Sequence, residues 1–189
     1  MNNSIRQQIV ISGVGGQGVL FVTRLLAEAA IDKGLAVFTS ETHGMAQRGG
    51  TVLSHLKVGS FASPLIRPMQ ADGLLALKME NIARHYFFLK KKGWIVVNHS
   101  GADMDKMANP VYSVNADSLA VKIDDPRSVN LIMLGYAMAA ISKTNDQSTL
   151  FCSIGDIRSV LKKRLEARPE MLGPALDALE AGYTSQRVS

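Results

Sequence analysis

The sequence predicts an α/β domain with a mostly parallel sheet, helices on both of its faces and further helices at the C-terminal end. Short apolar runs alternate with segments whose apolar residues recur every three or four positions, as strands and helices do. A glycine-rich turn separates the first strand from the first helix, and beyond Asp125-Pro126 the periodicity is helical. Because 189 residues suit one sizeable core, we expect residues 1–189 to form a single domain.

The N-terminal third contains one strand–helix–strand unit followed by a further strand. An apolar strand is expected over residues 8–12 and a helix over 18–33, with Gly34 in the position of a C-terminal cap. The continuously apolar run 35–40 predicts a second strand, buried on both faces. Residues 51–58 alternate between apolar and polar side chains, so we expect a third strand with one wetter face, which could run antiparallel to the others.

The later elements continue the alternation and then become helical. Pro64 and Pro68 predict an irregular crossing after the third strand. A buried strand is expected over residues 72–77, a central strand over 94–98 and a further strand over 111–114, with a helix over 79–92 that Gly93 would cap. Further helices are expected over residues 129–141, 154–165 and 169–183.

The composition limits the chemistry of the chain. Apolar residues make up 47% and charged residues 20%, which is ordinary for a folded globular protein. The single cysteine, Cys152, excludes a disulfide within the chain. It also excludes an iron–sulfur cluster held by this chain alone, since such clusters take about four thiolates. His85 and His99 have no cysteine or carboxylate partners at ligand spacing, and we expect no metal site.

The formal charge of +5 could indicate a protein that binds nucleic acid. Lysine and arginine are dense only at residues 90–92 and 162–164, both near the ends of expected helices, where cations interact favourably with the helix dipole. We interpret both clusters as solvated helix ends. The N-terminal residues contain no apolar signal segment, and no apolar run reaches the roughly 20 residues that span a membrane. We therefore expect a cytoplasmic protein that binds neither nucleic acid nor membrane.

The turn after the first strand has the spacing G-x-G-x-x-G, from Gly13 to Gly18. We expect Gly13 to make the tight turn, Gly15 to let a ligand approach the backbone and Gly18 to let the helix lie close to the strand. The N–H groups of Gly16, Gln17 and Gly18 would then point outward at the positive end of the helix dipole, where a phosphate or carboxylate can bind. This context predicts a Rossmann-like three-layer domain.

Two alternatives remain open for this glycine loop. The glycines can serve close packing only, without binding a ligand. The loop can also bind NAD or FAD, which requires an acidic residue at the end of the second strand to hold the ribose hydroxyls. Glu41 is near that position, but we expect it to open a ten-residue loop rather than to close a strand.

A second loop, residues 41–50, places an acid, an imidazole, an amide and a guanidinium beside the first. Arg48, flanked by glycine, could make a forked contact with a phosphate, with a carboxylate or with an acidic group on another subunit. The alternative is an ordinary surface loop with solvated side chains. The candidate ligand-binding residues of both loops are Gly13, Gly15, Gly16, Gln17, Gly18, Glu41, His43, Gln47, Arg48, Gly49 and Gly50.

The two loops together resemble the gamma subunit, or gamma domain, of the 2-oxoacid:ferredoxin oxidoreductases. The similar segments are residues 13–18, 39–50 and 72–76, with later similarity around Asn130, at Leu134-Gly135 and over 176–182. The segment His-Gly-Met-Ala-Gln-Arg-Gly-Gly is most like the small (beta) subunit of indolepyruvate ferredoxin oxidoreductase. Residues 162–164 and Arg168-Pro169 have no counterpart in that branch.

The resemblance implies an accessory subunit that is inactive alone and has no catalytic residue of its own. Such enzymes oxidatively decarboxylate a 2-oxoacid with thiamine diphosphate, pass electrons through iron–sulfur clusters to ferredoxin and deliver the acyl group to coenzyme A. Thiamine diphosphate and the clusters would belong to larger partner subunits, and the glycine loop could hold the phosphates of coenzyme A. The branch implies an aryl pyruvate as the 2-oxoacid. An independent nucleotide- or coenzyme A-binding protein and a pure assembly scaffold remain the alternatives.

Overall fold

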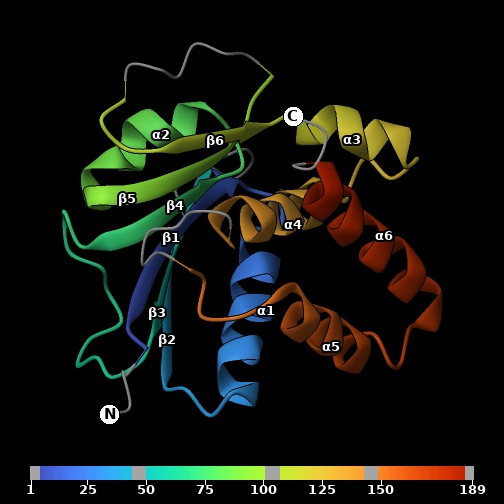
Figure 1. Cartoon of the computed structure of the whole chain (residues 1–189), viewed down its shortest axis with the longest axis horizontal. Coiled ribbons are helices and arrows are strands. Elements are labelled where there is room, and N and C mark those ends of the chain that lie inside the picture. The colour runs from blue at the N-terminus through green and yellow to red at the C-terminus, as the bar shows by residue number, and fades with distance from the viewer. Residues whose placement is uncertain (1–4, 44–49, 101–106, 143–148, 186–189) are drawn as a thin grey trace.

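A computed structural model of the chain describes residues 5–43, 50–100, 107–142 and 149–185. In these ranges six strands form one sheet in the order β2-β3-β1-β4-β5-β6 (Figure 1). The strands are β1 (Gln7–Val14), β2 (Val37–His43), β3 (Thr51–Val58), β4 (Ala71–Ala76), β5 (Leu89–Asn98) and β6 (Val111–Val114). The helices are α1 (Val19–Asp32), α2 (Glu80–His85), the 3-10 helix η1 (Tyr86–Phe88), α3 (Ala116–Lys122), α4 (Val129–Ser142), α5 (Ile154–Arg164) and α6 (Pro169–Ser185).

The strand directions confirm the expected mostly parallel sheet. β1, β4, β5 and β6 pair in parallel, whereas β3 pairs antiparallel with both β1 and β2. The antiparallel direction proposed for residues 51–58 is therefore correct. Because β3 lies between β2 and β1, these two strands point the same way without touching. The C-terminal ends of β1, β2, β4, β5 and β6 consequently meet at one edge of the sheet.

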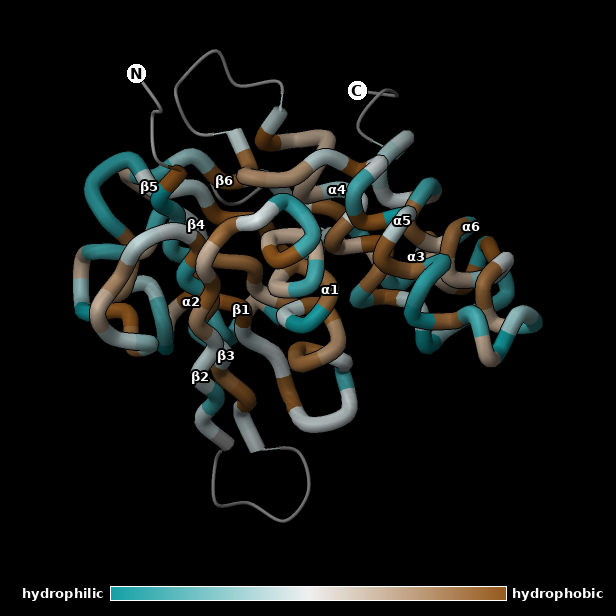
Figure 2. The backbone as a smooth tube through the Cα atoms, turned by 90° about the horizontal axis from the view of Figure 1, so that it is seen from below, coloured by the Kyte–Doolittle hydropathy of each residue, from teal (hydrophilic) through white to brown (hydrophobic). Residues whose placement is uncertain are grey.

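The sheet is covered on both faces, as expected. Alternate residues of β1 divide between two cores, since Ile9 and Ile11 face α1 and α4 while Val10 faces the other side. On that other side, Ile82 of α2 and Ile66 of the segment before β4 complete the smaller core. α5 and α6 pack outside α1 and α4. Figure 2 shows the most hydrophobic backbone where the central strands meet these helices.

The helix expected over residues 79–92 is wrong in its second half. α2 ends at His85, and after η1 the chain enters β5 at Leu89, which pairs with Ala71 of β4. Gly93 therefore lies inside a strand and caps no helix. Lys90, Lys91 and Lys92 lie at the start of a strand rather than at a helix end, and Lys90 pairs with Asp72. An exposed run of lysines fits a helix or a strand equally well, so the sequence alone could not decide between them.

The other helices agree with the pattern more closely. Gly34 follows α1 with a positive φ of 71°, as a C-terminal cap does. The basic cluster 162–164 lies in the last turn of α5, as expected, where Lys163 and Arg164 pair with Asp32 and Glu28 of α1. The pattern missed the short helix α3, which Asn115 caps by accepting a 2.9 Å hydrogen bond from the Ser118 N–H.

Helix α4 is the most deeply buried helix, and Asn130 to Ile141 are all buried. It packs backbone to backbone against α6, because a Cβ atom on Gly182 would lie 1.9 Å from the carbonyl oxygen of Ile132. Over the ranges given above, no helix is both long and apolar enough to cross a membrane.

Candidate functional site

The glycine loop forms a tight turn between β1 and α1, at the C-terminal edge of the sheet. The N–H of Gln17 donates a 3.0 Å hydrogen bond to the carbonyl oxygen of Val14, and Gly16 has a φ of 91°. A positive φ at the third position of such a turn is what a type II turn requires. Gly15 and Gly16 therefore make the turn that was assigned to Gly13.

Gly13 and Gly18 have other roles than those expected of them. Gly13 lies inside β1, where a Cβ atom would stand 2.8 Å from Cγ2 of Val19, so its missing side chain lets α1 lie close to the strand. Gly18 is the left-handed N-cap of α1, with a φ of 78°. A Cβ atom there would lie 2.0 Å from Nδ2 of Asn130, so Gly18 admits the start of α4 to the loop. Asn130 was noted in the family resemblance without a role at this loop.

Not all of the expected N–H groups face outward. The Gln17 N–H is used inside the turn, and the Gln17 side chain accepts a 2.8 Å hydrogen bond from the Val14 N–H. The N–H groups of Gly16 and Gly18 have no acceptor among the residues that the structure describes. α1 begins without a capping side chain and without an acidic residue in its first turn. The positive end of this helix is therefore suited to an anion.

The second loop meets the first through their backbones. The Gly15 N–H donates a 3.0 Å hydrogen bond to the carbonyl oxygen of Gly50. This contact supports the expectation that the two loops lie together. Residues 44–49, with Gln47, Arg48 and Gly49, and the side chain of His43 lie outside the described part of the chain.

Glu41 does not open the loop, because β2 continues through it to His43. Its side chain is exposed, and the residue pairs with Ser54 of β3. Since β3 intervenes, β2 lies two strand spacings from β1, which is about 10 Å. In a dinucleotide-binding fold the ribose-binding acid follows a strand next to the glycine-rich one. The position of Glu41 therefore argues against NAD or FAD at this loop.

Arg84 is a cation at this edge that the sequence did not reveal. It extends from α2 and donates a 3.1 Å hydrogen bond to Oγ1 of Thr51, which pairs with Val14. Within the expected helix over 79–92, nothing pointed to a contact with β3.

Two histidines form a buried polar cluster beneath the α2 side of the sheet. Oγ of Ser12 lies 2.9 Å from Nδ1 of His85, and the Ile66 N–H donates a 3.3 Å hydrogen bond to Nδ1 of His55. Burial is the main cause that lowers the pKa of both imidazoles, and His85 lowers the pKa of His55 further. Both imidazoles are neutral at pH 7, hydrogen-bonded and packed on Phe88, so they have a structural role.

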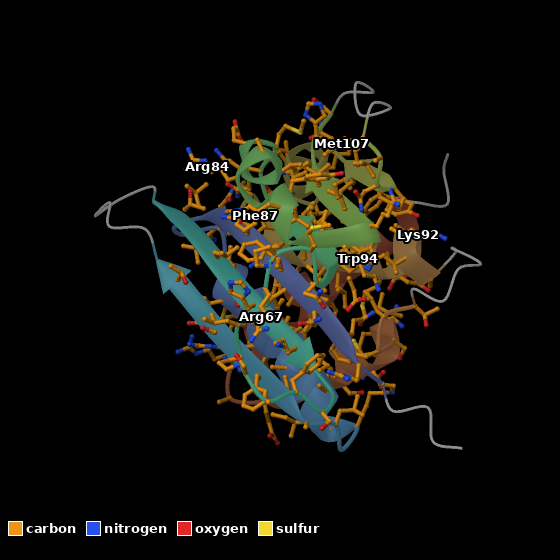
Figure 3. All side chains as sticks on the ribbon, turned by 90° about the vertical axis from the view of Figure 1, so that its left-hand side faces the viewer. Arg67, Arg84, Phe87, Lys92, Trp94 and Met107 are labelled. Carbon is orange, nitrogen blue, oxygen red and sulfur yellow. The ribbon has the colours of Figure 1, made fainter. Side chains whose placement is uncertain are left out.

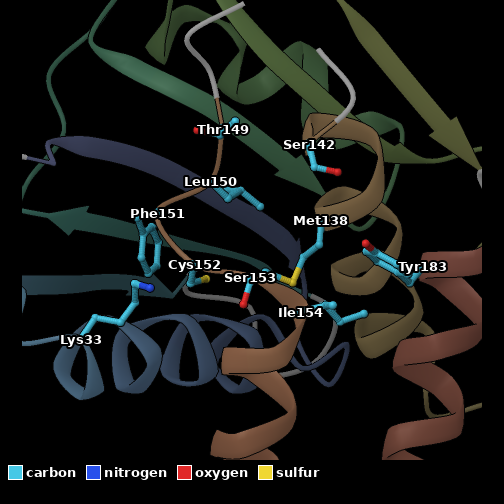
Figure 4. A pocket seen from close by; sticks show the side chains of 10 residues that line it. All are labelled: Lys33, Met138, Ser142, Thr149, Leu150, Phe151, Cys152, Ser153, Ile154 and Tyr183. Carbon is cyan, nitrogen blue, oxygen red and sulfur yellow. The ribbon is translucent and has the colours of Figure 1, made fainter. Parts of the chain in front are cut away.

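A cavity of about 360 Å³ lies on the opposite side of the sheet, between α4, α6 and the segment leading into α5 (Figure 4). Cys152 and Met138 contribute sulfur atoms to its lining. Burial raises the pKa of the Cys152 thiol to about 12, so the thiolate that a nucleophile requires is not formed at neutral pH. Among the described residues, no three His, Cys, Asp or Glu side chains gather as a metal site.

Comparison with known proteins identifies the family of the chain. The family model described as pyruvate ferredoxin/flavodoxin oxidoreductase matches residues 8–185. The chain belongs to this family. It is a gamma-type subunit of a multisubunit 2-oxoacid:ferredoxin oxidoreductase.

A similar protein is indolepyruvate oxidoreductase subunit IorB of Archaeoglobus fulgidus, 34% identical over 151 residues, which are 69% of this chain and 75% of the relative. The keto/oxoacid ferredoxin oxidoreductase gamma subunit of Geobacter sulfurreducens has a similar fold, with a TM-score of 0.72 at 21% identity, covering 97% of this chain and 99% of that one. The 2-oxoglutarate:ferredoxin oxidoreductase of Magnetococcus marinus, solved with 2-oxoglutarate, coenzyme A and succinyl-CoA bound, matches with a TM-score of 0.78 at 20% identity. That match covers 97% of this chain and only 31% of the Magnetococcus chain.

Proposed function

We propose that the chain is the small subunit of an indolepyruvate-type 2-oxoacid:ferredoxin oxidoreductase, and that its glycine loop holds the phosphates of coenzyme A. The observation that carries the coenzyme A proposal is the exposed Gly15-Gly16 turn before the uncapped start of α1. Backbone N–H groups at a helix N-terminus bind phosphate without any charged side chain. A protein of the same fold solved with coenzyme A bound supports this choice of ligand.

The chemistry of the reaction is assigned to partners. Oxidative decarboxylation requires thiamine diphosphate and iron–sulfur clusters, and a chain with one cysteine cannot supply the four thiolates of a cluster. We therefore place both cofactors on a larger catalytic subunit, which passes electrons to ferredoxin. The present chain binds and positions the acyl acceptor, coenzyme A. No catalytic residue is assigned to it.

The second loop completes the proposed binding site. Arg48 would supply charge to a coenzyme A phosphate or contact an acidic group of the catalytic subunit. Glu41, His43, Gln47, Gly49 and Gly50 remain predicted contacts. The indolepyruvate type rests on the similarity to IorB, and the aryl pyruvate substrate and the cytoplasmic location remain predictions.

Native purification of the tagged chain from its own cells tests the subunit assignment. We expect a brown, iron-containing complex with a larger thiamine diphosphate-binding chain, which reduces ferredoxin with an aryl 2-oxoacid and coenzyme A. The same complex should turn over pyruvate and 2-oxoglutarate more slowly. A colourless monomer that is active alone would contradict the assignment. A complex whose coenzyme A affinity is independent of this chain would leave it only a scaffold role.

A further inference from the structure

Three large apolar side chains are exposed on the α2 side of the molecule. Met69 is 67% exposed, and Leu65 and Phe87 are each 52% exposed. Leu65 and Met69 belong to the crossing segment, residues 60–70, which packs over β3 through the buried Ile66. Figure 3 views this side of the molecule and shows Phe87 between Arg84 and Arg67.

The backbone holds these side chains in place. The Met69 N–H donates a 2.9 Å hydrogen bond to the carbonyl oxygen of Phe87, which joins the crossing segment to η1. The ring of Phe87 lies 4.2 Å from that of Phe88, centroid to centroid, and Phe88 in turn packs on the buried His55 and His85. The apolar surface is therefore fixed to the core rather than carried on a free loop.

Cations without acidic partners surround this surface. Arg6, Lys57, Arg67 and Arg84 form no ion pair with any residue that the structure describes. Arg6 and the Lys57 amine lie over the ring of Phe61, at 4.5 Å and 4.6 Å from its centroid. Arg67 and Arg6 also contribute to the lowered pKa of Lys57, after the larger effect of burial, so the three cations are close enough to repel. The crossing segment contains no aspartate or glutamate.

The opposite side of the molecule differs. There Lys163 and Arg164 pair with Asp32 and Glu28, and Arg158 pairs with Glu180. Arg6, Arg67 and Arg84, in contrast, lie without an acidic partner among the described residues beside the exposed Leu65, Met69 and Phe87. A fixed apolar centre with a charged rim is typical of a protein–protein interface.

We propose that this surface, formed by Leu65, Arg67, Met69 and Phe87 with the rim cations Arg6 and Arg84, binds the catalytic subunit through an apolar patch bordered by carboxylates. The inference rests on the proposed function, since it assigns the contact of a subunit already taken to work in a complex. A second copy of the chain fits poorly, because a two-fold interface here would place Arg67 and its neighbours against the same cations.

The test uses the full chain co-expressed with its catalytic subunit. In the double variant Arg67→Glu/Met69→Asp, both substituted residues are exposed, and aspartate tolerates the left-handed φ of 60° at position 69. We expect the affinity for the catalytic subunit, measured by sedimentation, to fall roughly a hundredfold, because an apolar anchor and a charge contact are lost together. Wild-type association should also weaken as salt rises to about 0.5 M.

The matched control is Arg168→Glu/Met171→Asp, which makes the same charge change at the exposed start of α6. It should assemble like wild type. Coenzyme A binding by the isolated chain should be unchanged in both double variants. The inference would be overturned if the Arg67/Met69 variant bound the catalytic subunit as tightly as wild type, or if the control lost as much affinity. It would also be overturned if the wild-type chain formed a homodimer that this variant disrupts. A wild-type chain that does not associate with the catalytic subunit would instead refute the proposed function, and the inference with it.

Discussion

The backbone N–H of Gly15 donates a 3.0 Å hydrogen bond to the carbonyl oxygen of Gly50. This bond joins the turn after β1 to the residue that precedes β3, and so fixes the glycine loop to the end of the second loop. β3 lies between β1 and β2, so an antiparallel strand takes the place beside β1 that a parallel strand occupies in a dinucleotide-binding fold. Gly50, the last residue of the second loop, is therefore the point at which the structure joins that loop to the glycine loop.

Gly16→Asp should weaken coenzyme A binding. It places a carboxylate at the positive end of α1, where we propose that phosphate binds, and we expect at least a tenfold loss of affinity, which is about 1.4 kcal/mol. Titration calorimetry on the isolated chain and the KM for coenzyme A in the complex both measure this.

The control for that substitution is Gly34→Asp. Both glycines have a positive φ, 91° and 71°, and neither would bring a Cβ atom within 4 Å of another group. The two variants therefore share the backbone strain and the added charge, but Gly34 lies at the opposite end of α1. An equal change in the two variants would exclude the glycine loop as the binding site.

Gly182→Ala should destabilise the protein by about 1–3 kcal/mol, as overpacking does in a close-packed core. The added methyl group would meet the carbonyl oxygen of Ile132 at 1.9 Å and push α6 away from α4. In contrast, Gly155→Ala near the start of α5 meets only Ser153 Oγ, at 3.5 Å, and should stabilise by about 0.5–1 kcal/mol. Urea unfolding of the two variants checks the opposite signs; a loss in both would contradict the close contact.

Acid should destabilise the fold through His55 and His85. Both imidazoles have a pKa below the ordinary 6.5, so the unfolded chain binds protons more readily than the folded one. Their contribution to stability is present above pH 6.5 and is lost as the pH falls through the lowered values. The free energy of unfolding, measured between about pH 7.5 and 5, should fall less steeply in a His55→Gln/His85→Gln variant. An unchanged slope would show that these histidines do not carry the effect.

Cys152 should resist alkylation in the folded protein. Its thiol is 6% exposed, and burial raises its pKa to about 12, so iodoacetamide at pH 8 meets little thiolate. We expect modification in the native state to be at least about a hundred times slower than in denaturant, as followed by mass spectrometry. Rapid native labelling would mean that the cavity lined by Cys152 opens readily to solvent.

The sequence determined most strands and helices of this protein, because their evidence is local. Residues 9–11 and 94–97 are continuously apolar, as is typical of strands buried on both faces, and residues 129–141 are apolar enough to predict the central helix. The spacing of Gly13, Gly15 and Gly18 also placed a turn at the first strand–helix junction. The family resemblance was readable from the same segments, and the match over residues 8–185 confirms it.

Only the tertiary structure decided what depends on contacts between distant segments. Residues 89–93 became strand because β5 pairs with β4 there. Position 18 must be glycine because Asn130 of α4 occupies the space of a side chain there. Glu41 lies too far from the glycine loop to bind a ribose, because β3 separates β2 from β1. A local pattern records which side chains favour burial or a turn, but not which segment buries them. Strand order and helix packing decide which segments contact one another, and so they position the proposed coenzyme A site and the proposed docking surface.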